Sequence, residues 1–159
     1  TQHLRQRDPY TNWRFWDEAT AGLPRLALGP GSEVIGGPGE LTYDEMKGWL
    51  RRARCYLYTG TQPASYTLGL IEAGMTGTPI VSIGPSWMGI FPYGHTLFEG
   101  HEFASAWSDD PNRARGYLQR WLDHPGVAEE RGHEQRDWFI EHFGRDRVAQ
   151  DWAAFLGVP

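Results

Sequence analysis

Apolar positions follow two different periods along the chain, and the two kinds of segment alternate. Short runs of successive apolar residues predict strands at residues 26–28, 55–59 and 80–83, with weaker strands at 1–4 and 102–107. Segments with apolar residues at intervals of three and four predict helices at residues 12–20, 42–53, 65–76, 111–123, 127–143 and 145–156. The alternation predicts an α/β fold, a Rossmann-like parallel sheet of four to six strands flanked by helices. We expect one domain over residues 1–159, with a helical tail from about residue 111.

Local signals predict where several helices begin. Asn12 is expected to cap the first helix, and Asp109 or Asp110 the helix that opens with Pro111. Thr42 and Glu45 have the spacing of a capping box, in which each side chain binds a free amide of the helix start. The apolar stripe of that helix is Met46, Trp49, Leu50 and Ala53, and its end carries Arg51, Arg52 and Arg54. We interpret these arginines as an exposed helix end that suits the helix dipole.

Composition excludes several classes of protein. Hydrophobic residues make up 40% and charged residues 22%, and no apolar run approaches the roughly 18 residues of a membrane span. The net charge of −5 argues against a broad nucleic-acid surface. Cys55 is the only cysteine, which favours a reducing, cytoplasmic location. The histidines, His95 and His101 among them, show no metal-ligand spacing, so we expect no metal.

The segment from Tyr58 to Val81 carries the candidate chemistry. It is predicted to run from a strand through a loop of small residues, Gly60 among them, into a helix and then the next strand. Glu72 lies in that helix, where its carboxylate is suited to accept hydrogen bonds from a ribose diol. A salt-bridged helix residue is the alternative interpretation of Glu72 alone. The helix start forms an anion site through its dipole and the free amides around Ser65, Thr67 and Leu68.

Residues 68–81, Leu-Gly-Leu-Ile-Glu-Ala-Gly-Met-Thr-Gly-Thr-Pro-Ile-Val, resemble the donor-site signature of retaining glycosyltransferases of the GT-B fold. The resemblance is to the group 1, family 4-like enzymes, which include the glycogen-synthase-like and sucrose-synthase-like proteins. Residues 108–155 resemble the closing helices of the same family. The resemblance implies that the chain is the C-terminal, nucleotide-sugar-binding domain of a two-domain enzyme. Such an enzyme transfers a sugar from a nucleotide sugar to an acceptor with retention.

The resemblance also implies roles for individual residues. Glu72 would hold the ribose hydroxyls, and the amides of Thr67 and Leu68 would bind the diphosphate. The nucleotide sugar is then a substrate, and the family mechanism implies neither a cofactor nor a metal. The leaving group would be stabilised by the helix amides and an arginine.

Two further segments acquire a role from the resemblance. The loop that contains Ile35 and Gly36 would lie near the base, and Arg5 or Arg7 would meet the phosphates. An exposed N-terminal position is the alternative interpretation of the two arginines. Lys47, the only lysine, lies within the capped helix and offers no clear phosphate contact.

One departure from the family pattern keeps a different class of function open. The signature has a first glutamate that faces the donor sugar, and Ala64 stands in its place. The main alternative is therefore a non-catalytic nucleotide-binding or assembly module of the same fold. A flavodoxin-like regulatory domain is a second alternative, disfavoured by the strand entry at Gly77, Thr78 and Pro79 and by the long helical tail.

The expected partners follow from the missing half of the enzyme. They are the nucleotide sugar and an N-terminal acceptor-binding domain or subunit. Residues 84–100 form the longest irregular stretch, and such loops are usually functional. Its aromatic residues Trp87, Phe91 and Tyr93 are candidates for an exposed apolar cleft face, which would favour self-association.

Overall fold

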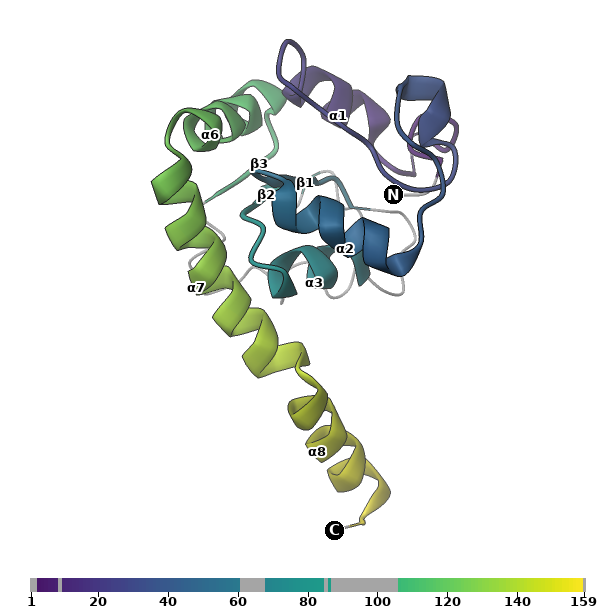
Figure 1. Cartoon of the computed structure of the whole chain (residues 1–159), viewed down its shortest axis with the longest axis vertical. Helices are drawn as coiled ribbons and strands as arrows, with labels where there is room; N and C mark the ends of the chain where they lie inside the picture. Colours follow the sequence, from purple (N-terminus) through teal and green to yellow (C-terminus); the bar gives the residue numbers. More distant parts are fainter. Residues whose placement is uncertain (1–2, 9, 61–67, 85, 87–105, 159) are drawn as a thin grey trace.

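Three short parallel strands form the centre of the molecule in the computed structural model, which describes residues 3–8, 10–60, 68–84, 86 and 106–158 (Figure 1). The strands are hydrogen-bonded in the order β1 (Tyr56–Tyr58), β2 (Ile80–Ile83) and β3 (Trp107–Ser108). Tyr56 pairs with Ile80, and Ser82 pairs with Trp107. Parallel neighbours need a crossover connection, which α3 (Leu68–Met75) supplies between β1 and β2. The α/β class and the parallel pairing are therefore confirmed.

Helices cover the sheet in two groups. On one side, α1 (Trp13–Ala19) packs with α6 (Pro111–Asp123), whereas α2 (Tyr43–Arg52) and α3 lie on the other (Figure 1). Between the two groups, α7 (Pro125–Phe143) runs past the sheet and contacts both α6 and α3. The last helix, α8 (Arg145–Leu156), extends away from the body and has no buried residue (Figure 1).

Several predicted helix ends are confirmed in atomic detail. The amide of Glu45 donates to Thr42 Oγ1 at 3.3 Å, and the Thr42 amide donates to Glu45 Oε2 at 2.9 Å, which completes the capping box. Asp110 caps α6, since its Oδ1 accepts from the amide of Asn112 at 2.9 Å. Gly77 follows the end of α3 with φ of +78°, a conformation that suits glycine. At these helix ends, the interacting groups lie within one turn of each other, so the local sequence was enough to predict them.

The core surrounds β2. All four residues of this strand are buried, as expected when helices cover both faces of a parallel sheet. Phe15 from α1, Leu70 from α3 and Phe139 from α7 are also at most 1% exposed. The apolar faces of three helices therefore meet around one strand.

Two glycines allow α7 to approach the sheet closely. A Cβ at Gly74 would lie 2.0 Å from Cδ2 of Phe139, and one at Gly132 would lie 2.1 Å from the carbonyl oxygen of Gly77. Both distances are far below van der Waals contact, so only glycine fits at either place. Gly74 and Gly77 belong to the segment that resembles a donor signature, and in this structure both serve the contact between α3 and α7.

A glutamine completes the attachment of α7. Oε1 of Gln135 accepts a hydrogen bond of 2.9 Å from the amide of Ile80, the first residue of β2. The Gln135 side chain is 1% exposed, so the bond is shielded from water. The helix therefore satisfies a backbone donor of the sheet directly.

The predicted cap at Asn12 is wrong. Asn12 precedes α1 with φ of +53°, and its side chain makes no cap hydrogen bond. Instead, its Nδ2 donates to the Thr59 carbonyl oxygen at 2.6 Å, and Thr59 Oγ1 donates to the Thr11 carbonyl oxygen at 3.0 Å. Asparagine tolerates the left-handed conformation, and its amide here satisfies a buried carbonyl at the end of β1. The chain before α1 is thereby fixed to that strand.

The strand predicted at residues 26–28 is absent, because these residues have no regular secondary structure. A strand needs a neighbour for its backbone groups, and β1 has a cavity at the side that faces them. His3 and Leu4 lie in a turn rather than in the strand predicted at 1–4, whose first two residues fall outside the described ones. Of the strand predicted at 102–107, Trp107 belongs to β3, and residues 102–105 also fall outside. The described sheet is therefore smaller than the four to six strands predicted.

Candidate functional site

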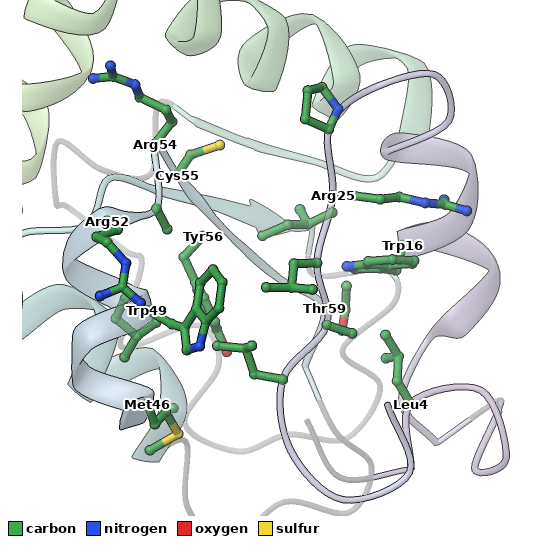
Figure 2. A pocket seen from close by; sticks show the side chains of 18 of the residues that line it. Leu4, Trp16, Arg25, Met46, Trp49, Arg52, Arg54, Cys55, Tyr56 and Thr59 are labelled. Atoms are coloured by element: carbon green, nitrogen blue, oxygen red, sulfur yellow. The ribbon is translucent and has the colours of Figure 1, made fainter. Parts of the chain in front are cut away.

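A cavity of about 470 Å³ opens beside β1, between the free edge of that strand, helix α2 and residues 24–28 (Figure 2). Its volume lies within the range of about 300–1,000 Å³ that is typical of small-molecule sites. The described wall is mostly apolar and aromatic, and includes Trp16, Leu26, Met46, Trp49, Tyr56 and Leu57. The cavity occupies the place where the predicted strand 26–28 would have paired with β1.

Glu72 supplies the only carboxylate among the described residues that line the cavity. It belongs to α3, and partial burial raises the pKa of its carboxyl group. Within the part of the chain that the structure describes, this carboxylate makes no hydrogen bond or ion pair, which disfavours the salt-bridged alternative there. Its oxygens are therefore available as acceptors for a hydroxyl-bearing ligand.

Two neutral polar side chains come from the edge of β1. Burial, with a smaller contribution from the charge of Glu72, raises the pKa of Tyr56 to about 12. Burial raises the pKa of Cys55 to about 11. Both groups are protonated at neutral pH, so Cys55 is a poor nucleophile and Tyr56 is a potential hydrogen-bond donor.

Two arginine–tryptophan pairs flank the cavity (Figure 2). The Arg52 guanidinium carbon lies 4.7 Å from the centre of the Trp49 ring, and the Arg25 carbon lies 4.7 Å from the centre of the Trp16 ring. Both separations are within cation–π range. Arg25 Nη1 also lies 2.7 Å from Oδ1 of Asp17, which neutralises it. Arg52 has no carboxylate partner among the described residues.

The structure places Arg5 and Arg7 in the turn at residues 3–8, and both are exposed. The Arg5 guanidinium carbon lies 5.9 Å from the centre of the Trp13 ring. Their neighbour Leu4 is 4% exposed and lines the cavity, and its carbonyl oxygen accepts from Thr11 Oγ1. The turn that bears both arginines is thus held beside the cavity and near the carboxyl end of β1.

Gly60 and Leu68 flank the part of the predicted anion site that falls outside the described residues. Gly60 follows β1, is buried and has φ of +72°. Leu68 opens the described part of α3, and its side chain is 62% exposed. Ser65, Thr67 and Ala64 lie outside the described residues.

The structure does not bring Ile35 and Gly36 to the cavity. Ile35 ends the short 3₁₀ helix η1 (Ser32–Ile35), and Gly36 follows it with φ of +81°. Neither residue lines the cavity. Their loop contacts the N-terminal turn instead, where the His3 amide donates to the Pro30 carbonyl oxygen at 2.7 Å. The loop therefore lies beside the turn that carries Arg5 and Arg7.

Sequence reasoning assigned no binding role to the residues that build most of the wall. Trp49 was assigned to an apolar helix stripe and Arg52 to an exposed helix end, although both line the cavity. One available signal was a tryptophan three residues before an arginine, since this spacing places both on one helix face. Trp49 is 39% exposed, so it is not fully part of the core.

No group of three potential metal ligands occurs among the described residues. Nor does any helix in the described ranges have the length and apolar character needed to cross a membrane. Comparison of the chain with protein-family models, with curated proteins and with solved structures finds no match.

Proposed function

We propose that the chain is the donor-binding domain of a retaining glycosyltransferase of the GT-B fold, built on a Rossmann-like sheet. One observation carries the proposal. Glu72, the residue to which the donor signature assigns the ribose, lines a ligand-sized cavity, and its carboxylate makes no hydrogen bond or ion pair with the described residues. A carboxylate offers only acceptors, which suits the two hydroxyl donors of a ribose diol.

The order of elements around Glu72 supports this proposal. Open α/β sheets bind ligands beyond the carboxyl ends of their strands. Gly60 lies at that end of β1, and α3 begins after the loop that follows it. Amides at a helix start attract anions, so a diphosphate bound there would lie within reach of a ribose on Glu72.

The N-terminal turn adds positive charge to the same end of the sheet. The hydrogen bond from Asn12 to Thr59 holds the chain that carries Arg5 and Arg7 close to the end of β1. In the proposed reaction, the bond between the anomeric carbon and the diphosphate oxygen breaks, and negative charge grows on the diphosphate. Helix amides and an arginine would stabilise that charge.

Calorimetry tests the proposal directly. The purified chain is titrated with the diphosphates of uridine, adenosine and guanosine and with their glucose conjugates. We expect at least one nucleoside diphosphate to bind, and Glu72→Gln to weaken that binding by about 1–3 kcal/mol, the scale of charge-assisted hydrogen bonds. Glu129→Gln makes the same change of charge on the exposed surface of α7 and is the matched control.

Two results would contradict the proposal. One is the absence of binding by every nucleoside diphosphate at millimolar concentration. The other is equal binding by wild type and a folded Glu72→Gln variant, which would make Glu72 a structural residue. Binding of nucleoside diphosphates without any affinity for nucleotide sugars would favour the alternative, a non-catalytic nucleotide-binding module.

A further inference from the structure

We propose that the cavity beside β1 is a binding site for a planar aromatic molecule that carries an anionic group. The inference rests on an apolar slot, on tryptophan rings in its walls and on an unneutralised guanidinium at its edge. It does not rest on the proposed function, because the tryptophan rings and the guanidinium are different side chains from Glu72, although Glu72 lines the same cavity.

The shape of the cavity suits a flat ligand. It lies between the free edge of β1 and residues 24–28, where a further strand of the sheet would otherwise pair. Neighbouring strands lie about 4.8 Å apart, so the unpaired edge leaves a gap in the plane of the sheet, which we call the slot. Trp49 and Trp16 stand on opposite sides of it (Figure 2). Aromatic rings in a cavity wall favour stacked or edge-on contact with an aromatic guest.

The edge of β1 offers hydrogen bonds inside this apolar slot. The Tyr56 amide donates to the Pro79 carbonyl oxygen at 2.7 Å, which directs it toward β2. Backbone groups of successive residues point to alternate sides of a strand, so the Leu57 amide and carbonyl face the free edge. An aromatic ligand with a polar substituent would satisfy these groups, whereas a purely aliphatic one would not.

Arg52 supplies the charge that selects an anion. Its guanidinium lies over the Trp49 ring and has no carboxylate partner in the described part of the chain. Arg25 cannot play this part, because Asp17 already neutralises it at 2.7 Å. The Arg54 guanidinium points away from the cavity in Figure 2. A stacked guanidinium keeps its N–H groups free to bind a carboxylate or a phosphate in the plane of the ring.

Two kinds of molecule share this chemistry: a free aromatic acid, and a nucleotide whose base enters the slot while a phosphate reaches Arg52. The test uses 2-naphthoate as an aromatic anion and 2-naphthalenemethanol as its uncharged counterpart, both titrated by calorimetry. We expect wild type to bind both probes, with 2-naphthoate the tighter. Competition by a nucleoside diphosphate then tells whether the two kinds of ligand share the slot.

Variants of the wall make the test specific. Arg52→Gln is expected to weaken the binding of 2-naphthoate about fivefold or more, the scale of one charged contact. The same substitution should leave the affinity for 2-naphthalenemethanol unchanged. Ala27→Phe places a ring in the slot and is expected to abolish binding of both probes. Ala149→Phe makes the same substitution at an exposed position of α8 and is expected to bind like wild type. Ala27→Leu, a smaller change, replaces Ala27→Phe if the latter does not unfold cooperatively.

Glu72→Gln separates this site from the proposed function. This variant is expected to bind a nucleoside diphosphate more weakly than wild type. It is expected to bind 2-naphthoate at least as tightly, because the substitution removes a like charge from the wall. Absence of 2-naphthoate binding at millimolar concentration would overturn the inference. Unchanged affinity in a folded Ala27→Phe variant would also overturn it. An equal loss of affinity for both probes in Arg52→Gln would do the same.

Discussion

Gly74 of α3 lies directly against the ring of Phe139 of α7, so closely that a Cβ at Gly74 would lie 2.0 Å from Cδ2 of that ring. The contact joins the crossover helix of the sheet to α7, the longest helix in the described part of the chain. It also accounts for one glycine of the donor-like segment without any ligand. Its physical consequence is that α3, and with it Glu72, is positioned by packing against α7.

Gly74→Ala is accordingly expected to destabilise the protein. Overpacking of a tight core contact costs about 1–3 kcal/mol, which exceeds the intrinsic gain of alanine in a helix. Urea unfolding followed by fluorescence measures the change. Gly116→Ala is the matched control, because Gly116 lies in α6 with open space around it. It is expected to stabilise the protein by about 0.5–1 kcal/mol, and an equal effect of the two substitutions would contradict the packing argument.

Asn12 is expected to be costly to replace, because it joins two distant segments. Asn12→Ala removes the hydrogen bond to the Thr59 carbonyl oxygen and places alanine at φ of +53°. Loss of a buried partner costs about 1–3 kcal/mol, and the left-handed backbone adds about 1–2 kcal/mol. Asn12→Gly avoids the second term, so it should unfold at a higher urea concentration than Asn12→Ala. Equal midpoints for the two variants would show that backbone conformation contributes nothing there.

The stability effect of Glu72 should depend on pH. Burial raises the pKa of Glu72 in the folded state, so the ionised form is disfavoured there relative to the unfolded chain. The protonated carboxyl costs nothing below the unfolded pKa near 4.5, and the penalty develops as pH rises through the folded pKa. Glu72→Gln should therefore stabilise the protein near neutral pH, and the difference from wild type should fade below pH 4.5. Urea midpoints across this range measure it, and a pH-independent difference would refute it.

The chain alone is expected not to transfer sugar to an acceptor. Under the proposed function the acceptor binds mainly to a second domain, and positioning of the two reactants accounts for about 7–11 kcal/mol of the barrier. Slow hydrolysis of a nucleotide sugar stays possible, since water needs no docking surface. The assay incubates the purified chain with labelled nucleotide sugars and a broad acceptor panel. Multiple-turnover glycosylation in a sample free of any second polypeptide would disprove the expectation.

Elements with local determinants could be predicted from the sequence. The capping box of Thr42 and Glu45 depends on two side chains one turn apart, and it formed as the spacing indicated. The strand at Ile80–Ile83 was also predicted from its apolar run, and the helix predicted to end at residue 76 ends at Met75, just before Gly77. In each case the interactions that decide the structure lie within a few residues.

Elements with distant determinants could not be predicted. Asn12 has the residue type of a helix cap, yet its partner, the Thr59 carbonyl oxygen, lies 47 residues away. Residues 26–28 have the apolarity of a strand, but apolarity does not reveal whether β1 lies close enough to pair. The same gap produces the cavity, so the spacing of Trp49 and Arg52 on one helix face could not by itself reveal that both residues line it. Glu72 was singled out as a candidate because of its place in a helix between two strands and because residues 68–81 resemble a donor signature.

Hydrogen exchange of the Ile80 amide can report when α7 detaches from the sheet. Its proton is held by Oε1 of Gln135, so it exchanges with solvent deuterium only when the helix moves away or the strand itself opens. The Tyr56 amide, bonded to Pro79 within the sheet, reports strand opening alone. Faster exchange at Ile80 than at Tyr56 would mean that α7 detaches before the sheet unfolds. Because of this one glutamine, hydrogen exchange at a single backbone amide reports whether α7 and the sheet unfold together or in sequence.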